Sequence, residues 1–338
     1  MVQYARMNMQ YKCLQELGWD GEGNLGDCIQ NLAVRNLYSK INIFDSDLIK
    51  VNRDDIPTYS GPECSLVMQA WYGDYMGTFP LPWTDKICPI FLGFHLNKVN
   101  NTRERFIKEN IHEKMKPFMP IGCRDRNTRD FLLNLGVDAY FSGCMTLTFD
   151  TRTKQPEKGK IFMVDLRPRI KKHIPKKILK QVDEYITHQY FWDKYPITSA
   201  GANKFEKDAE KILNRYKNEA KLIITSRIHV AMPCVAMGIP VVFITEAPND
   251  ERFDVLRGIL PIYTKRDIRY INWTPCPVDI TELKQAIINN AIAQITGKNT
   301  AEARQNLTNI TENMRPIQFL PWYVKLFRKL FNKKNAKK

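Results

Sequence analysis

The stretch KLIITSRIHVAMPCVAMGIPVVFIT, residues 221–245, decides the fold class of the chain. Two apolar runs of strand length stand at its ends, Lys221–Thr225 and Pro240–Thr245. Between them, the pattern from Ile228 to Met237 predicts a helix, and Gly238 is a suitable residue to end it. Pro233 lies inside this pattern and lacks a backbone donor, so the helix either starts late or bends there. A strand, a helix and a second strand in this order predict a parallel β-α-β unit.

The same alternation of apolar runs and helical patterns extends over the rest of the chain. Five further apolar runs have strand length: Ser65–Gln69, Ile87–Phe94, Met119–Cys123, Ala139–Ser142 and Ile161–Leu166. Helical spacing recurs in three segments: Asn127–Gly136, Ile178–Tyr190 and Phe205–Tyr216. The polar residues 150–160, which include a proline and a glycine, predict a linker. The sequence therefore predicts an α/β protein with two Rossmann-like lobes, residues 1–150 and 151–300, followed by a helix and basic tail over residues 301–338.

Length and composition agree with two packed lobes. The chain has 338 residues, of which 43% are hydrophobic and 26% charged, and this excludes disordered and collagen-like polymers. The longest apolar run, residues 230–244, is broken by prolines and a glycine and is shorter than the roughly 20 residues of a membrane span. The eight cysteines never lie within four residues of one another, so no C-x-x-C zinc or redox pair exists. With no N-terminal secretion pattern, the sequence predicts a cytoplasmic protein.

The basic excess is concentrated in two segments. Lys and Arg outnumber Asp and Glu by 51 to 36, which gives a net charge of +15. Residues 152–180 hold eleven basic and two acidic residues, and residues 324–338 hold seven basic residues and no acidic one. A nucleic-acid-binding protein more often spreads its basic residues over one docking face. We therefore expect anionic partners other than nucleic acid.

The tail has the pattern of an amphipathic helix. From Leu320 to Phe331, large apolar residues recur at steps of three and four, and lysines and arginines lie between them. One interpretation is an interfacial helix that attaches the protein to the inner face of the plasma membrane. The other is that the aromatic stripe packs back across the first lobe.

The sequence GEGNLG at residues 21–26 matches the G-x-G-x-x-G pattern of dinucleotide-binding proteins. Asp45 follows at a suitable distance, but the segment before the glycines is polar, unlike a central parallel strand. A glycine-rich surface turn is the simpler interpretation. A third interpretation keeps Asn24, Gly26 and Asp27 together as a ligand-binding loop that presents one carboxylate at the end of a strand.

The sequence SRIH at residues 226–229 lies where a predicted strand meets its helix. A helix N-terminus offers free amides and positive charge, and Arg227 adds a planar fork that binds phosphate or carboxylate beside Ser226. His229 is then placed to exchange a proton with the bound anion. Arg167 also follows a predicted strand, and if the two strands are neighbours it converges with Arg227 on one small polyanion. The competing interpretations are helix capping with a structural histidine, and a solvated basic loop.

Two further sites follow predicted strands of the first lobe. The sequence GCRDRNT at residues 122–128 places Arg124 either in the cleft or in a capping Arg-Asp pair. His95 ends the apolar run 87–94 and is either an acid or base of the cleft or a hydrogen-bonded structural residue.

Four short motifs, taken in order, resemble those of the polysaccharide pyruvyl transferase family. They are N-x-G-D-x-I-Q at residues 24–30, G-C-R-D at 122–125 with Thr128, S-G-C followed by T-L-T at 142–148, and S-R-I-H at 226–229 followed by Pro233 and G-x-P at 238–240. The resemblance covers about residues 20–245, and the remainder of the chain lies outside it.

The resemblance implies a two-lobed fold similar to the B-type glycosyltransferases, with a cleft between the lobes. The first lobe would bind the acceptor and the second the donor, phosphoenolpyruvate. The reaction it implies joins the donor's three-carbon group to a hydroxyl pair of a glycan or lipid-linked sugar. A pyruvate ketal forms and phosphate is released, in capsular or exopolysaccharide synthesis. In the family the Arg-x-His pair sits at the donor site, which carries over to Arg227 and His229. We expect no metal and no cofactor.

On this basis each candidate residue receives a role. His229 is the acid, and Asp27 orients or deprotonates the acceptor. The remaining candidates divide between the donor site (Arg227, Arg167 and Ser226) and the acceptor side or cleft (Asn24, Gly26, Arg124 and His95). The first competing function is a glycosyltransferase with a nucleotide-sugar donor on the same fold, and the second is a non-catalytic protein that binds membrane or nucleic acid through the tail. A dehydrogenase is the weakest alternative, because the sequence contains no second motif that supports it.

Overall fold

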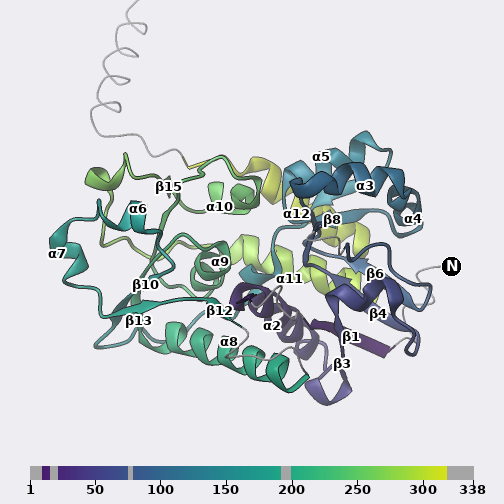
Figure 1. Ribbon diagram of the computed structural model, residues 1–338, viewed down its shortest axis with the longest axis horizontal. Helices are drawn as coiled ribbons and strands as arrows, with labels where there is room; N and C mark the ends of the chain where they lie inside the picture. The colour runs from purple at the N-terminus through teal and green to yellow at the C-terminus, as the bar shows by residue number, and fades with distance from the viewer. Residues whose placement is uncertain (1–9, 16–21, 75–78, 192–198, 318–338) are drawn as a thin grey trace, which may run out of the picture.

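The computed structural model describes residues 10–15, 22–74, 79–191 and 199–317 (Figure 1). Within these ranges the chain forms two lobes, each built on a parallel sheet with helices around it. Gly21 and the amphipathic tail lie outside the described residues, so both interpretations of the tail stay predictions.

The first lobe has a parallel sheet with the strand order β3-β1-β4-β6. These strands are β3 (Ile49–Asn52), β1 (Gln10–Gln15), β4 (Cys64–Met68) and β6 (Ile87–Phe91). A parallel bridge between Phe94 and Cys123 connects the end of β6 to the pair β8 (Ile121–Cys123) and β9 (Ala139–Phe141). The helices are α2 (Leu25–Ser39), α3 (Thr102–Lys108), α4 (Ile111–Met115) and α5 (Arg126–Asn134). A short pair, β5 (Trp71–Tyr72) and β7 (His95–Leu96), follows the ends of β4 and β6.

The second lobe has a five-stranded parallel sheet with the order β11-β10-β13-β14-β15. Its strands are β11 (Glu184–Ile186), β10 (Lys160–Val164), β13 (Ala220–Thr225), β14 (Val241–Ile244) and β15 (Ile262–Tyr263). Its helices are α6 (Pro168–Lys171), α7 (Lys176–Leu179), α8 (Ser199–Glu219), α9 (Ile228–Ala236) and α10 (Asp254–Arg257). The predicted β-α-β unit is confirmed as β13, α9 and β14, and β10 is the neighbour of β13.

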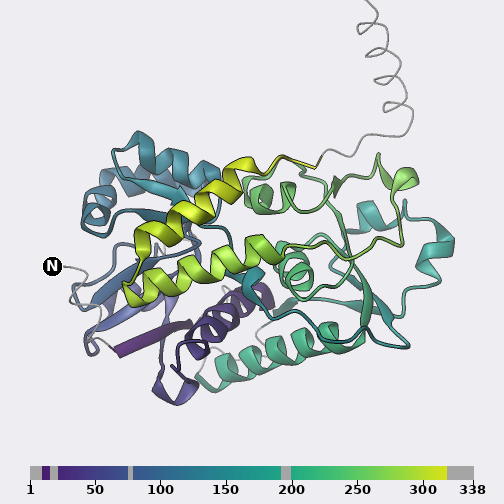
Figure 2. The same cartoon turned by 180° about the vertical axis from the view of Figure 1, so that it is seen from behind.

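Two helices after the second sheet, α11 (Thr281–Thr296) and α12 (Thr300–Asn313), return to the first lobe along the back of the molecule (Figure 2). The side chain of Asn290 in α11 donates to the Tyr140 hydroxyl of β9 at 3.0 Å, and Arg126 of α5 donates to the Thr311 carbonyl of α12 at 2.8 Å. The predicted α/β fold with two Rossmann-like, glycosyltransferase-B-like lobes is confirmed. The domain boundaries that we drew stay a prediction.

Both sheets have the same strand topology. In each, the second sheet strand in the chain lies on one side of the first strand and the third lies on the other side. Ligands of open α/β sheets bind outside the carboxyl ends of the strands at such a reversal. In the second lobe the reversal lies between β10 and β13, which are followed by Arg167 and Arg227 respectively.

Helix α2 is buried between the two lobes. Eleven of its fifteen residues are buried, as expected for a helix that is covered on nearly all sides. Its side chains belong to the same hydrophobic cluster as those of α8, α9 and α11. The Asn24 side chain begins the helix by accepting the Gly26 backbone N–H at 3.1 Å. The two lobes therefore share one core rather than meeting only at a cleft.

Polar contacts add to this joint between the lobes. Arg35 of α2 pairs with Glu206 of α8 and with Asp45, and Lys50 of β3 pairs with Glu206. A two-stranded antiparallel ribbon, formed by β2 (Glu22–Asn24) and β12 (Gln189–Phe191), connects the start of α2 to the second lobe.

Two expectations from the sequence are wrong. The helix predicted over 178–190 is absent: only α7 is helical, and the chain then forms β11 and β12. Pairing of β11 with β10 and of β12 with β2 outweighs the helical spacing. Helix α5 begins one residue after Asp125, which caps it through the Thr128 N–H at 2.7 Å in place of Asn127. The predicted stop at Gly136 is confirmed by its φ of +74°.

We predict that Leu37→Ala lowers the free energy of unfolding by about 2 to 5 kcal/mol, because Leu37 is fully buried in the shared core. Urea unfolding followed by circular dichroism measures this loss. The matched control is Leu133→Ala on α5, where the leucine is 45% exposed and the expected change is within about 0.5 kcal/mol. Similar losses in both variants would contradict the central role of α2.

Candidate active site

A cavity of about 750 Å³ lies between the lobes, at the carboxyl ends of both sheets. The first lobe contributes seven lining residues: Gly23, Asn24, Gly26, Asp27, Arg53, Trp71 and Arg124. The polar and charged lining of the second lobe includes Asp165, Arg167, His188, Gln189, Ser226, Arg227, His229, Glu246, Asp250 and Arg252. Five arginines therefore face the same space as four carboxylates, which favours an anionic ligand.

His229 sits in the first turn of α9, where the helix is distorted. Its backbone angles, φ −82° and ψ 15°, are not helical. The cause is Pro233 four residues later, because a proline has no N–H for the His229 carbonyl and its ring crowds that carbonyl. Of the two outcomes expected from the sequence, the helix bends rather than starting late.

The His229 ring is held between Arg124 and Gly26. Arg124 Nη1 lies 3.5 Å from His229 Nε2, and because a guanidinium only donates, the neutral ring accepts at Nε2 and carries its proton on Nδ1. A side chain at position 26 would begin 3.1 Å from the His229 Cβ, so a glycine leaves room for the ring. Burial, and then the charges of Arg124 and Arg252, lower the pKa of His229 well below its ordinary value. His229 is therefore neutral near pH 7.

Arg227 is held by two acceptors of its own lobe. Its Nε donates to Asp165 Oδ2 at 3.0 Å and its Nη2 to Gln189 Oε1 at 2.9 Å. Its backbone N–H donates to the Thr225 hydroxyl at 2.9 Å. The Ser226 hydroxyl donates to the Ile244 carbonyl at 2.7 Å, so this side chain already has a structural partner in β14.

Arg167 and Arg227 line the same cavity, as expected if β10 and β13 are neighbours. Arg167 is the more peripheral of the two, because its side chain is 72% exposed and pairs with Glu246 at 3.1 Å. The side chain of Arg227 is 32% exposed. Arg167 lies nearer the rim and Arg227 deeper.

Arg124 differs from the other arginines of the cavity. It is 2% exposed and donates to the Gln30 side chain at 2.7 Å, and its Nε is buried without a hydrogen-bond partner. In the described part of the chain, no carboxylate lies within ion-pair distance of it. A buried cation without a counter-ion is costly, so this guanidinium favours an incoming anion.

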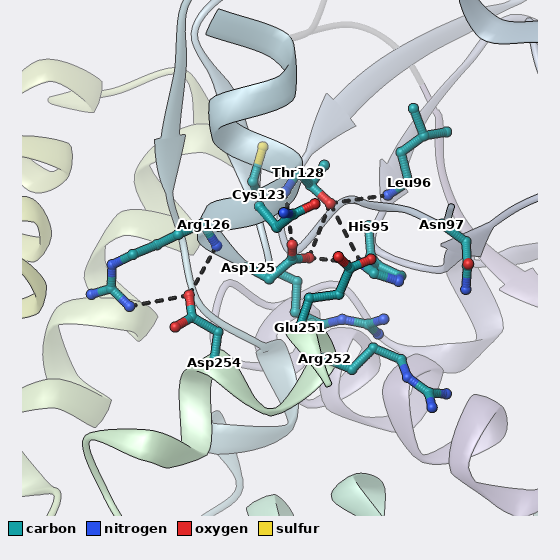
Figure 3. Close-up of polar contacts among 12 residues, drawn as sticks. His95, Leu96, Asn97, Cys123, Asp125, Arg126, Thr128, Glu251, Arg252 and Asp254 are labelled. Atoms are coloured by element: carbon teal, nitrogen blue, oxygen red, sulfur yellow. Dashed lines mark hydrogen bonds and ion pairs between the residues drawn. The ribbon is translucent and has the colours of Figure 1, made fainter. Parts of the chain in front are cut away.

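His95 does not line the cavity, contrary to the expectation that it is a cleft residue. It is fully buried, and its Nδ1 lies 2.6 Å from Asp125 Oδ2 (Figure 3). The other oxygen of the Asp125 carboxylate, Oδ1, accepts the Thr128 N–H. Burial, and then the nearby charge of Arg124, lower the pKa of His95. The physical reason for the difference is the Phe94–Cys123 bridge, which encloses His95 in the joint between β7 and α5. Beside this pair, Asp254 accepts the Arg126 N–H at 2.9 Å and so connects the second lobe to α5 (Figure 3).

Asn24 and Gly26 lie at the cavity wall and have structural roles: Asn24 caps helix α2, and Gly26 leaves room for the His229 ring. Asp27, in the first turn of α2, accepts from the Gln30 side chain at 3.3 Å. The pKa of Arg252 is raised mainly by the hydrogen bonds that it donates to Asp250, and the charge of Asp27 makes a smaller contribution. Asp27 and Arg252 line the same cavity from different lobes.

Several cavity residues were missed from the sequence. Asp165, Glu246 and Trp71 follow β10, β14 and β4, so the rule that ligands bind at the carboxyl ends of strands was sufficient to find them. His188 and Gln189 belong to the segment that was predicted as a helix, and no sequence signal marked them. Asp45, which a dinucleotide site would use, pairs with Arg35 and does not line the cavity.

His188 is a buried neutral histidine at the cavity wall. Its Nε2 lies 2.8 Å from the Tyr216 hydroxyl, and the two rings are stacked at an interplanar angle of 10°. Burial lowers the pKa of His188 to about 4. Its backbone N–H donates to Asp165 Oδ2 at 2.9 Å, and its carbonyl accepts the Leu25 N–H at 2.8 Å.

Two parallel sheets facing one arginine-rich cavity define a two-lobed α/β protein of the glycosyltransferase-B-like class. The polysaccharide pyruvyl transferase family model matches residues 24–248, so the chain belongs to this family. The resemblance seen in the sequence motifs is thereby confirmed. Among curated proteins, no sequence matches significantly.

Similar solved structures are distant. An uncharacterised protein from Klebsiella pneumoniae is 14% identical, with a TM-score of 0.43 over 74% of this chain and 89% of that one. A putative UDP-N-acetylglucosamine 2-epimerase from Listeria monocytogenes is 12% identical, with a TM-score of 0.42 over 92% and 100%. A wall teichoic acid polymerase, TagF, is 11% identical, with a TM-score of 0.37 over 91% and 89%.

Among the described helices, none combines the length and apolar character that crossing a bilayer requires. In the same residues, no group of three or more histidine, cysteine or acidic side chains is arranged to hold a metal ion.

We predict that His188 makes the protein less stable in acid. Because its folded pKa is about 4 and an unfolded histidine has a pKa near 6.5, the unfolded state binds the extra proton between these values. Stability then falls as pH falls through this window, by up to about 1.4 kcal/mol per pH unit from this group. Urea unfolding at pH 7 and pH 5 measures the loss. His188→Gln should show a smaller loss, and His173→Gln, at an exposed position, is the control. An unchanged loss in His188→Gln contradicts this prediction.

Proposed function

We propose that the protein transfers the three-carbon group of phosphoenolpyruvate to two hydroxyls of a glycan or lipid-linked sugar, forming a pyruvate ketal and releasing phosphate. The observation that carries the proposal is Arg124, a buried guanidinium with no carboxylate within ion-pair distance among the described residues, which contacts His229 in a cavity shared with Arg227. Membership of the polysaccharide pyruvyl transferase family supports the reaction class.

The donor fits the second-lobe side of the cavity. Phosphoenolpyruvate carries a phosphate and a carboxylate, and arginine binds both in a planar, two-pronged manner. Arg227 has two of its nitrogens engaged by Asp165 and Gln189, and no hydrogen bond in the described structure occupies its Nη1. Arg227, Arg124 and the positive end of the α9 helix dipole supply the positive charge, and Arg167 adds to it at the rim.

The reaction adds one proton to the methylene carbon of the donor, and a second proton leaves with the phosphate. Protonation of the methylene carbon gives oxocarbenium character at the adjacent carbon, where the first sugar hydroxyl forms a C–O bond and loses its proton. The C–O bond to phosphate then breaks, and the second hydroxyl closes the ketal. Of the two hydroxyl protons, one balances the proton added to carbon and the other leaves with phosphate. We assign the acid role to His229.

This role requires His229 to gain a proton when the donor binds. Before the donor binds, burial and the charge of Arg124 keep the pKa of His229 low and the ring neutral. A dianionic phosphate beside the ring offsets these charges and raises the pKa. Binding of the donor thus protonates His229, which is the acid that the reaction requires.

The acceptor fits the first-lobe side. Asp27 at the start of α2 is positioned to accept a hydrogen bond from a sugar hydroxyl and to orient or deprotonate it. Asn24 and Gly26 hold the first turn of α2, which carries Asp27, against His229. We place the product in capsular or exopolysaccharide synthesis, at the cytoplasmic side of the membrane, on the basis of the family.

Ligand binding tests the donor assignment. Phosphoenolpyruvate should raise the thermal unfolding midpoint, whereas UDP-N-acetylglucosamine should not. Arg227→Lys should weaken phosphoenolpyruvate binding on the order of tenfold, because it removes the planar fork. The matched variant Arg167→Lys should weaken it by less than about threefold, because Arg167 is 72% exposed and solvent screens it. Stabilisation by the nucleotide sugar alone would instead support a glycosyltransferase.

Calorimetry tests the acid. Binding of phosphoenolpyruvate near pH 7 should take up about one proton, measured in two buffers of different ionisation enthalpy. Because the bound anion raises the His229 pKa, affinity should increase as pH falls from 8 toward 6. His229→Gln should abolish the proton uptake and the transfer reaction while the protein stays folded. Equal uptake by the variant would remove His229 from the acid role.

A further inference from the structure

Asp165 occupies a strained position at the edge of the cavity. It follows β10 directly and has a φ of +46°, in the left-handed region that non-glycine residues rarely adopt. Its own N–H donates to the Ile186 carbonyl at 3.1 Å, which holds the backbone in this conformation. Backbone strain of this kind concentrates at functional sites, where surrounding contacts maintain it.

In this backbone conformation the Asp165 carboxylate contacts Arg227. Asp165 Oδ2 accepts from Arg227 Nε at 3.0 Å and from the His188 backbone N–H at 2.9 Å. The Asp165 side chain is 13% exposed, so the pair is poorly screened by solvent. The other contact of the Arg227 guanidinium is Gln189, the residue after His188. One carboxylate thus connects the arginine to the β12 ribbon.

We propose that Asp165 is the positioning residue of the donor site, which aims the Arg227 guanidinium and neutralises it until the donor anion binds. This inference rests on the proposed function. When phosphate or carboxylate binds, Asp165 remains beside Arg227 and repels the anion, so orientation is obtained at a cost in affinity. The arrangement differs from that of Arg124, which has no carboxylate within ion-pair distance in the described residues.

The variant Asp165→Asn separates charge from geometry. Asparagine tolerates the left-handed conformation as well as aspartate does and keeps a carbonyl oxygen for both hydrogen bonds. Removing the negative charge should tighten binding of phosphoenolpyruvate and inorganic phosphate on the order of tenfold. Turnover should fall on the order of tenfold, because a neutral acceptor orients the guanidinium less firmly. A lower KM together with a lower kcat is not expected from a purely structural residue.

Glu246→Gln is the matched control. It also removes one negative charge from the cavity wall, but its partner Arg167 is largely exposed. We expect it to tighten anion binding by less than about threefold. Asp165→Gly is the second variant: it relieves the positive φ and removes the acceptor, and it should combine tight anion binding with a larger loss of turnover.

Calorimetric titration of the full chain and its variants with phosphoenolpyruvate, and separately with inorganic phosphate, distinguishes the outcomes. Unchanged or weaker anion binding by Asp165→Asn, or an equal gain in Glu246→Gln, overturns the role of Asp165. If the wild type binds phosphate but not phosphoenolpyruvate, the proposed function is overturned. The phosphate titrations of the wild type and the variants then still test the role of Asp165. If no protein of the series binds either anion, both are overturned.

Discussion

The burial of α2 between the lobes holds the two halves of the candidate site together. Two sheets with the same topology each expose a ligand-binding edge, but a shared site exists only if these edges are held face to face. The apolar surface of α2 joins the core of α8, α9 and α11, so separating the lobes would expose it to water. The same helix carries Asp27 and Gly26 at its start, and this places them against His229 of the other lobe.

Charge in the cavity is balanced unevenly. Arg227, Arg167 and Arg252 each have a carboxylate partner, whereas buried Arg124 contacts only the Gln30 side chain and the neutral ring of His229 among the described side chains, both through Nη1. Three histidines close to the cavity have lowered pKa values because burial disfavours their charged forms. The site is therefore cationic because of its arginines, and its histidines are neutral until an anion changes their surroundings.

The sequence predicted the parts of the site that depend on local rules. Arg167, Arg227 and Asp27 follow strands or begin helices, and their neighbours in the chain were sufficient to assign them to the cavity wall. His95 satisfied the same local rule, yet the bridge between Phe94 and Cys123 encloses it with Asp125. The segment of β11 and β12 failed in the opposite way, because its helical spacing was outweighed by strand partners in both lobes.

From the sequence alone, the β-α-β unit around Pro233, the parallel sheets and the family motifs could be predicted, because strand and helix periodicity and turn residues act over short distances along the chain. Only the tertiary structure showed that buried Arg124 has no carboxylate within ion-pair distance among the described residues, that Asp165 accepts a hydrogen bond from Arg227, and that His188 lies at the cavity wall. Burial and charge pairing depend on residues that are far apart in the chain. Such contacts depend on how the two lobes pack against α2. No local sequence pattern specifies this packing.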